Sequence, residues 1–335
     1  MTERLRRVAD AVGVPVPALI RPHRLAPGDR ISVVAPSGPV PADRLAAGLE
    51  VLRGWDLEPE VSPHVLDGHP CGYLAAGDQA RADDFQDAWC DPTTTAVLCA
   101  RGGYGVQRMV DLLDWDEMRA APPKALIGYS DITALHEAVA TRLGLATVHG
   151  PMAAAATFLE DEPTREGLRR TLFAPESVQV MAPAGARTLV PGRAEGVTLG
   201  GCLSLLAADL GTPFARASAA GGILLLEDVG EEPYRLDRYL TQLLRAGWFD
   251  GVAAVVLGSW AECGPHDAVR DLVVDLLGPL GVPVVEEFGF GHCASTLTMP
   301  LGVPAVLDAP AHDAPSPGDP ASSGPVLTME VPALA

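Results

Sequence analysis

The chain has 335 residues, of which 48% are hydrophobic, and a formal net charge of -19 at pH 7. This length allows two domains with sizeable cores, the hydrophobic content excludes a disordered chain, and the acidity disfavours nucleic acid and anionic membrane surfaces as partners. No run of about 18 apolar residues occurs, and the charged first ten residues precede no apolar segment, so we expect no membrane span, no secretory signal and a cytoplasmic protein.

In the first half of the chain, short apolar runs alternate with amphipathic segments. Residues 1–25 are expected to be an N-terminal extension. Strands are predicted at 30–38 (ending in a turn), 58–65, 96–100 and 125–127, and helices at 43–54, 78–89, 104–113 and after residue 130. This alternation predicts an α/β domain over residues 26–160, with a parallel sheet covered by helices on both faces.

The junction at residues 124–136 (KALIGYSDITALH) is the most informative stretch. A buried strand ends at Ile127, Gly128 and Tyr129 turn the chain, and a helix follows Ser130. A serine at such a turn has its hydroxyl pushed out of the sheet, beside the first N–H groups of the helix, as a nucleophile requires. In the alternative interpretation, Ser130 or Asp131 only caps the helix.

A glycine-rich turn, 101–105 (RGGYG), follows the strand at 96–100. Its glycines either form a tight turn only, or let backbone N–H groups approach a substrate closely. Because both this turn and Ser130 follow strands of a parallel sheet, they are predicted at the ligand-binding edge of that sheet.

The pattern breaks between the two halves, where several prolines predict a linker at 161–192. The C-terminal domain is expected over 193–335, with strands at 196–199, 223–226, 253–257, 305–307 and 326–331 and helices at 236–245 and 267–277. A low-complexity segment, 309–324, is predicted to be a mobile loop.

A carboxylate and a histidine in this second half can complete a Ser–Glu–His triad with Ser130. Glu227 ends an apolar strand, and His292 follows a glycine-rich segment. The order Ser, Glu, His is one of the known triad orders, and the triad assembles in space rather than in sequence. Asp228 and Glu231 compete for the carboxylate role, and His136 and His149 compete for the base.

Together these residues resemble the LD-carboxypeptidase family of serine peptidases, the muramoyl-tetrapeptide carboxypeptidases. The matching stretches, in chain order, are 34–38 (VAPSG), 73–77 (YLAAG) with Arg81, 101–105 (RGGYG), 128–131 (GYSD), 149–152 (HGPM), 200–205 (GGCLSL), 226–231 (LEDVGE) with 234–238 (YRLDR), 291–292 (GH) and 297–302 (LTMPLG). They span about residues 28–308, and as an ordered set they are specific.

The resemblance implies an amidotransferase-like N-terminal α/β domain, a smaller β-rich C-terminal domain and a homodimer. Residue by residue, it implies Ser130 as nucleophile, Glu227 as the carboxylate and His292 as general base. It further implies an oxyanion hole made by the backbone N–H of Asp131 and one from Gly102 or Gly103. The family's second glycine motif usually reads Gly-Gly-Asn, and here Cys202 replaces the asparagine.

The implied reaction is hydrolysis of the amide bond between an L-configured centre and terminal D-alanine of a murein tetrapeptide, in peptidoglycan recycling. We expect Arg101, Tyr129 and His149 to bind this substrate, with Arg101 the candidate partner of its terminal carboxylate and Arg235 and Arg238 the weaker ones. No cofactor and no metal are expected, since there is no HExxH motif and the eight histidines lack metal-ligand spacing. The six cysteines likewise lack CxxC spacing, which argues against a zinc ribbon.

Two other functions stay open at this point. A related branch of serine peptidases, resembling the microcin C immunity protein, cleaves aminoacyl-adenylate analogues with the same triad and would need an aromatic platform, for which Trp260 is a candidate. A catalytically silent module that binds muropeptides is the second alternative.

Overall fold

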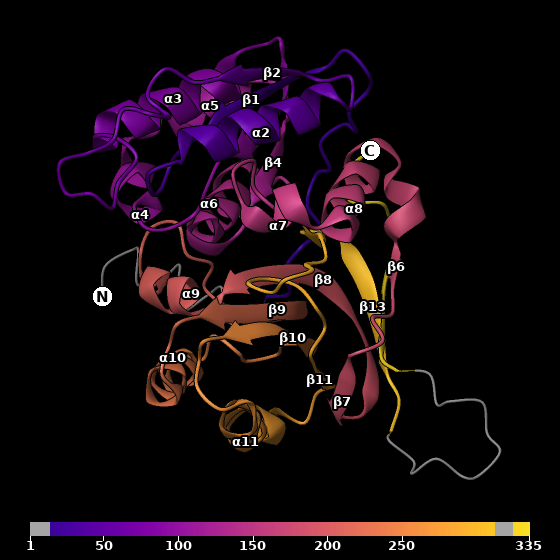
Figure 1. Ribbon diagram of the computed structural model, residues 1–335. Helices are drawn as coiled ribbons and strands as arrows, with labels where there is room; N and C mark the ends of the chain where they lie inside the picture. The colour runs from indigo at the N-terminus through magenta and orange to yellow at the C-terminus, as the bar shows by residue number, and fades with distance from the viewer. Residues whose placement is uncertain (1–13, 312–323) are drawn as a thin grey trace. The chain divides into compact units, whose positions relative to one another are not determined.

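The computed structural model describes residues 14–311 and 324–335, which form two compact units (Figure 1). The N-terminal unit comprises Leu19–Val178, Ala294–Leu301 and Pro332–Ala335. The C-terminal unit comprises Gln179–Cys293 with the described parts of 1–18 and 302–331. The fold class is the predicted one, a two-domain α/β protein, and each unit is built around one sheet.

The sheet of the N-terminal unit has six strands in the order β12-β5-β4-β3-β1-β2. Five of them are parallel, and β12 runs antiparallel to β5. The strands are β1 (Arg30–Val34), β2 (Glu58–Val61), β3 (Thr94–Cys99), β4 (Ala125–Gly128), β5 (Thr147–His149) and β12 (Met299–Leu301). The helices are α2 (Ala42–Arg53), α3 (Asp78–Cys90), α4 (Val106–Met109), α5 (Trp115–Ala120), α6 (Thr133–Leu143), α7 (Ala156–Glu160) and α8 (Glu162–Phe173).

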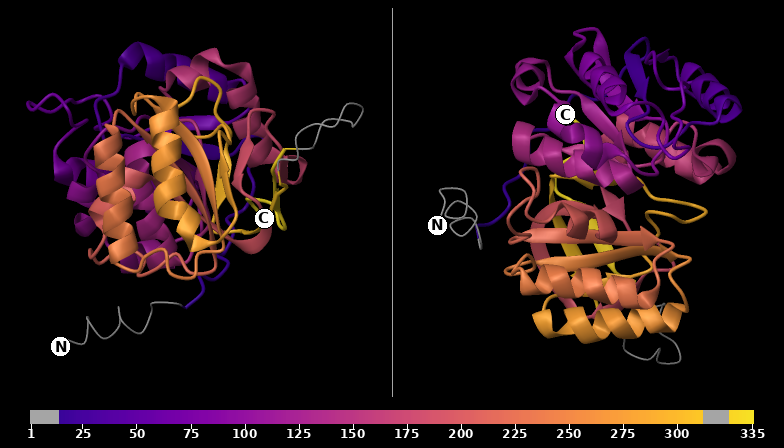
Figure 2. Two further views of the ribbon diagram at one scale, coloured as in Figure 1. Left: turned by 90° about the horizontal axis from the view of Figure 1, so that it is seen from below. Right: turned by 90° about the vertical axis from the view of Figure 1, so that its left-hand side faces the viewer.

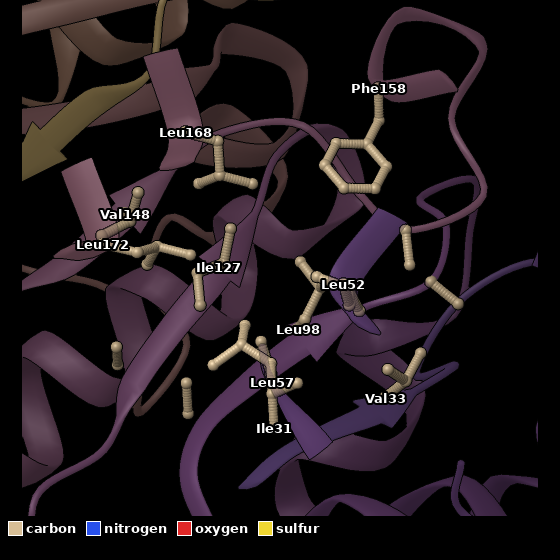
Figure 3. Close-up of a cluster of buried hydrophobic side chains, with 14 of the residues drawn as sticks. Ile31, Val33, Leu52, Leu57, Leu98, Ile127, Val148, Phe158, Leu168 and Leu172 are labelled. Carbon is tan, nitrogen blue, oxygen red and sulfur yellow. The ribbon is translucent and has the colours of Figure 1, made fainter. Parts of the chain in front are cut away.

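Helices cover both faces of this sheet, because alternate residues of its strands are buried on either side. One face packs against α2, α7 and α8 in the apolar cluster of Figure 3, which contains Ile127, Leu52, Phe158 and Leu168. Leu126, the strand neighbour of Ile127, points to the other face and is also fully buried. Each such side chain contributes about 1.5–3 kcal/mol to folding by leaving water.

The sheet of the C-terminal unit has eight strands in the order β6-β14-β13-β8-β9-β10-β11-β7. Strands β8 to β11 are parallel, and the flanking strands are antiparallel to their neighbours. The strands are β6 (Val180–Met181), β7 (Arg187–Val190), β8 (Gly192–Cys202), β9 (Gly222–Val229), β10 (Ala254–Ala261), β11 (Val284–Glu286), β13 (Pro304–Ala309) and β14 (Val326–Met329).

In the described part of this unit, the α-helices that accompany the sheet are α9 (Leu203–Asp209), α10 (Pro233–Arg245) and α11 (His266–Leu277). Figure 2 shows α10 and α11 side by side along the sheet. Leucines of α10, such as Leu236 and Leu240, pack against Leu224 and Leu226 of β9. This packing buries the strand up to Leu226, directly before Glu227.

The segment 161–192 differs from the linker expected there, since it contains α8, β6, β7 and the short helix Pro175–Val178. Asp161 caps α8 by accepting the N–H of Thr164 at 2.9 Å, and Pro163 lies in the first turn, where a missing N–H costs nothing. Leu168 and Leu172 then bury one face of α8 in the core. The prolines of this segment therefore lie at or near the ends of helices and strands, and they do not prevent these elements from forming.

Two further expectations fall largely outside the described residues. Residues 1–13 of the expected N-terminal extension and residues 312–323 of the expected loop 309–324 are not described. On either side of that loop, β13 and β14 pair as antiparallel neighbours. Among the helices of the described ranges, none is long and apolar enough to cross a membrane.

Candidate active site

Ser130 occupies a sharp turn between β4 and α6, as predicted. Its φ is +66°, one of only a few positive values among the non-glycine residues described. A serine in this left-handed conformation costs on the order of 1–3 kcal/mol and persists only where its surroundings enforce it. Gly128 permits the turn, because a Cβ there would lie 2.9 Å from the side chain of Ile132. This strained strand–turn–helix is the geometry that presents a nucleophilic hydroxyl.

The glycine turn after β3 lies against Ser130. A Cβ placed on Gly102 would stand 2.9 Å from Cβ and 3.1 Å from Oγ of Ser130, so only glycine allows this approach. Gly103 has a φ of +121°, which also favours glycine. The structure thus brings together the two segments of the N-terminal unit that the sequence singled out. It also adds Ser37, which follows β1 and donates a hydrogen bond of 2.6 Å to Asp131; only the motif 34–38 hinted at it.

In the C-terminal unit, Glu227 and His292 form a short hydrogen bond. Glu227 lies near the end of β9 with no exposed surface, and its Oε2 is 2.6 Å from Nδ1 of His292. The same oxygen accepts the backbone N–H of His292 at 3.2 Å, and Ser259 donates to the His292 carbonyl at 2.8 Å. With Nδ1 committed to Glu227, proton transfer by this imidazole would use Nε2.

The electrostatics of this pair favour the imidazolium. Burial acts to lower the pKa of His292, but the hydrogen bond and charge of Glu227 outweigh it, and the charge of Asp228 adds to them. The net result is a His292 pKa raised above its usual 6.5. A carboxylate-bound imidazole with this tendency is suited to take and return a proton near neutral pH.

The competing carboxylates of this unit have other partners. Asp228 accepts the N–H of Ser204 at 2.7 Å and that of Val229 at 2.9 Å, and Cys202 Sγ donates to it at 3.2 Å. Glu231 pairs with Arg235 at 3.5 Å. These contacts join β9 to the start of α9 and to α10.

The competing histidines lie in the interior of the N-terminal unit, with Tyr129. His136 is buried, its Nε2 donates to the carbonyl of Gly128 at 2.9 Å, and burial lowers its pKa to about 3. His149 is 2% exposed, and its ring centroid is 5.6 Å from that of Tyr129. These rings pack against one another next to the end of β4, and the expected substrate-binding roles of Tyr129 and His149 stay predictions.

The arginines proposed for the substrate carboxylate lie at the surface of their units. Arg101 is exposed and donates to the carbonyl of Pro39 at 2.6 Å. Arg235 and Arg238 lie over the ring of Tyr234, with guanidinium carbons 5.9 and 5.4 Å from its centroid. In residues 14–311 and 324–335, no group of three or more His, Cys, Asp or Glu side chains is arranged to hold a metal ion.

Comparison with known proteins decides the family. Residues 31–150 match the LD-carboxypeptidase N-terminal domain, and residues 195–307 match the LD-carboxypeptidase C-terminal domain. The chain belongs to the LD-carboxypeptidase family. Its resemblance to this family, stated above from motifs alone, is confirmed.

Relatives of this LD-carboxypeptidase family member carry related names. A putative carboxypeptidase of Streptomyces coelicolor is 68% identical over 292 residues, covering 87% of this chain and 94% of that protein. A probable murein peptide carboxypeptidase of Bacillus subtilis is 35% identical, covering 86% and 91%. The murein tetrapeptide carboxypeptidase of Pseudomonas aeruginosa is 34% identical, covering 83% and 93%.

Solved structures share the fold. The muramoyltetrapeptide carboxypeptidase of Oxalobacter formigenes aligns with a TM-score of 0.75 at 27% identity, over 90% of this chain and 99% of that one. The microcin C7 self-immunity protein MccF, in complex with glutamyl sulfamoyl guanosine, aligns with a TM-score of 0.81 at 23% identity, over 94% and 99%. Among the sequence relatives, MccF of Escherichia coli is 28% identical over 321 residues, 85% of this chain and 92% of that protein.

Proposed function

We propose that this family member is a cytoplasmic serine carboxypeptidase that releases terminal D-alanine from murein tetrapeptides. The observation that carries the proposal is the 2.6 Å bond between Glu227 and His292, because such a pair has a clear use as the basic half of a hydrolytic triad. The strained Ser130 and the names of the murein peptide relatives support it.

In the proposed mechanism, His292 removes the proton of the Ser130 hydroxyl as that oxygen attacks the carbonyl carbon of the L-centre. His292 then returns the proton to the nitrogen of the leaving D-alanine, and an acyl-enzyme ester remains on Ser130. A water molecule, deprotonated by the same imidazole, attacks the ester carbonyl, and the imidazolium returns that proton to Oγ of Ser130 as the product carboxylate leaves. Glu227 holds the tautomer of His292 and stabilises the imidazolium in both steps.

The negative charge of the tetrahedral intermediate needs hydrogen-bond donors at the nucleophile. We assign this role to the backbone N–H of Asp131 and to that of Gly102, which borders Ser130 Oγ, or of Gly103, the next residue. Losing one such donor typically raises the barrier by about 3 kcal/mol.

Recognition of the substrate is part of the same proposal. Its terminal carboxylate requires a cation, for which we assign Arg101, while Tyr129 and His149 shape the wall of the pocket. We further propose that the enzyme acts as a homodimer. Replacing Arg101 by alanine should then raise the KM for the tetrapeptide, and an unchanged KM and kcat would remove Arg101 from the assignment.

A second candidate function is hydrolysis of aminoacyl-adenylate analogues. It is supported by the 28% identity to MccF of Escherichia coli and by the shared fold. Such a substrate needs an exposed aromatic ring on which the adenine can stack. The candidate, Trp260 in β10, fits this role less well because it is partly buried against the core of its own unit. A silent binding module is the remaining alternative, and the Glu227–His292 pair speaks against it.

The test is mass spectrometry of synthetic muramoyl-tetrapeptide and free tetrapeptide, incubated with the wild type and with Ser130→Ala. Loss of one D-alanine with the wild type only supports the proposal, and a peptide ending in L-alanine controls for stereochemistry. If both peptides stay intact while an aminoacyl sulfamoyl adenosine is cleaved, the second candidate takes its place. If all substrates stay intact, the binding module is favoured.

A further inference from the structure

Two buried charged side chains of the N-terminal unit, Arg81 and Asp131, have no part in the mechanism above. Both residues are 2% exposed. Arg81 lies on α3, and Asp131 follows the nucleophile, where only its backbone N–H has been assigned a role. Burying a charge costs several kcal/mol unless excellent partners offset it, so their partners are informative.

Arg81 binds carbonyl groups from separate loops. Its Nη1 donates to the carbonyl of Pro36, beyond β1, and to that of Gly105, beyond β3, the latter at 2.9 Å. Its Nε donates to the carbonyl of Ala76 at 3.2 Å, and Nη2 pairs with Asp78 at 2.5 Å.

Asp131 binds the residues next to two of these carbonyls. Its Oδ2 accepts the hydroxyl of Ser37 at 2.6 Å and the N–H of Val106 at 2.9 Å. The pairs 36–37 and 105–106 are therefore each held twice, through a carbonyl by the cation and through a donor by the anion. We call Arg81 and Asp131, with these four loop residues, the loop clamp.

The loop clamp includes Gly105, the last residue of the glycine turn 101–105. Gly105 closes that turn with a φ of +137°, and a Cβ there would stand 2.8 Å from Arg81 Nη1. At the other end of the turn, the Gly102 carbonyl accepts the N–H of Gly38 at 3.1 Å, next to the clamped Ser37. The turn that borders Ser130 is thus held at one end by Arg81 and Asp131 and at the other by Gly38, in the loop after β1.

We propose that Arg81 and Asp131 are positioning residues, whose side chains hold the glycine turn at the distance from Ser130 that its N–H donor requires. This inference rests on the proposed hydrolytic function of Ser130. It predicts an effect on kcat rather than on KM, because the oxyanion exists only in the transition state.

The test compares loop-clamp variants with matched buried charges elsewhere in the same unit. Asp84 is a buried carboxylate that accepts the N–H of His64 at 2.9 Å, and Lys124 is a buried cation that donates to two carbonyls at 2.7 Å. Asp84→Asn and Lys124→Met therefore lose comparable buried bonds that do not involve the glycine turn.

We expect kcat for D-alanine release to fall about 100-fold in Asp131→Ala and Arg81→Met, with KM nearly unchanged. In Asp131→Asn, kcat should fall only about tenfold. The amide oxygen of asparagine can take the place of Oδ2, which accepts the hydrogen bonds of both Ser37 and Val106. The controls should melt at lower temperature but keep kcat within about twofold of the wild type.

Hydrogen exchange gives a readout that does not depend on activity. The amides of residues 102–106 should exchange faster in Asp131→Ala and in Ser37→Ala, which removes a single clamp bond, but not in Lys124→Met. Unchanged exchange and unchanged kcat in Asp131→Ala and Ser37→Ala would overturn the inference. If Ser130→Ala stays active, the proposed function fails instead, and hydrogen exchange still decides whether the clamp exists.

Discussion

The carboxylate of Glu227 reaches the Nδ1 atom of His292 at 2.6 Å because residue 291, between them in space, has no side chain. A Cβ on Gly291 would overlap Oε2 of Glu227 and lie 2.6 Å from its Cγ, and the φ of Gly291 is +90°. One glycine thus permits the contact on which the proposed base depends.

Replacing Gly291 by alanine should displace Glu227 and lower activity. We expect a fall in kcat of at least about 100-fold and a loss of stability of about 2–3 kcal/mol, from the clash and the positive φ together. Gly289→Ala is the matched control, since Gly289 also has a positive φ, +76°, but open space around its Cβ position. Denaturant titration and steady-state kinetics of both variants make the comparison, and equal losses of kcat would contradict the explanation.

The pH dependence should follow the Glu227–His292 pair. The base must be neutral to accept a proton, so kcat/KM should rise with pH through a pKa above 6.5, the direction in which Glu227 moves His292. Glu227→Gln removes the raising contributions of Glu227 and leaves burial opposed only by the charge of Asp228. The rising limb of the kcat/KM profile should therefore shift to lower pH while kcat falls about 10³–10⁴-fold. A limb that stays in place in the glutamine variant would show that another group titrates.

The same pair should make folding stability depend on pH. Because the folded-state pKa of His292 lies above its unfolded value, the pair stabilises the fold fully below about pH 6.5 and loses this contribution as pH rises through the folded-state pKa. The free energy of unfolding of His292→Gln should lack this decline. Urea titrations at several pH values measure it, and an identical decline in the variant would contradict the assignment.

Ser130 should be a strained residue that function requires. Ser130→Ala keeps a Cβ at a φ of +66°, whereas Ser130→Gly relieves it, so the glycine variant should be more stable than the alanine variant by about 1 kcal/mol. Both should lack hydrolytic activity. Thermal unfolding of the two variants tests this, and an alanine variant as stable as the glycine variant would show that the turn is relaxed.

His136 should act through stability rather than through proton transfer. Its pKa of about 3 keeps the ring neutral at working pH, and its bond to the Gly128 carbonyl supports the turn before Ser130. His136→Ala should therefore lose about 1–3 kcal/mol of stability while the pH profile of kcat/KM stays in place. His292→Ala should abolish turnover instead. Loss of the pH limb in His136→Ala would move the base assignment to His136.

The predictions that succeeded rest on signals local in sequence. The apolar run before Gly128 and the helical spacing after Ser130 predicted the β4–α6 turn. The close approach of backbone N–H groups to a substrate, expected from the glycines after β3, stays a prediction, and the structure shows Gly102 close to Ser130. Likewise, a helix was predicted at residues 236–245, where α10 (Pro233–Arg245) is found.

What the sequence did not predict depends on long-range contacts. Strand β12 is only three residues long and joins β5 from a segment about 150 residues later, so no local pattern identifies it. Helix α8 was missed because Pro163, a helix breaker in most positions, lies in its first turn. The loop clamp was missed since a buried arginine such as Arg81 looks like any surface residue of a charged helix until its partners are known.

The most direct test of the central claim, that Ser130, Glu227 and His292 act as one triad, is the rate at which a fluorophosphonate labels the protein. We expect a single adduct that maps to Ser130, formed at least about 100-fold more slowly in His292→Ala and in Glu227→Gln. Labelling of Ser130 at the wild-type rate in those variants, or an adduct on another residue, would contradict it.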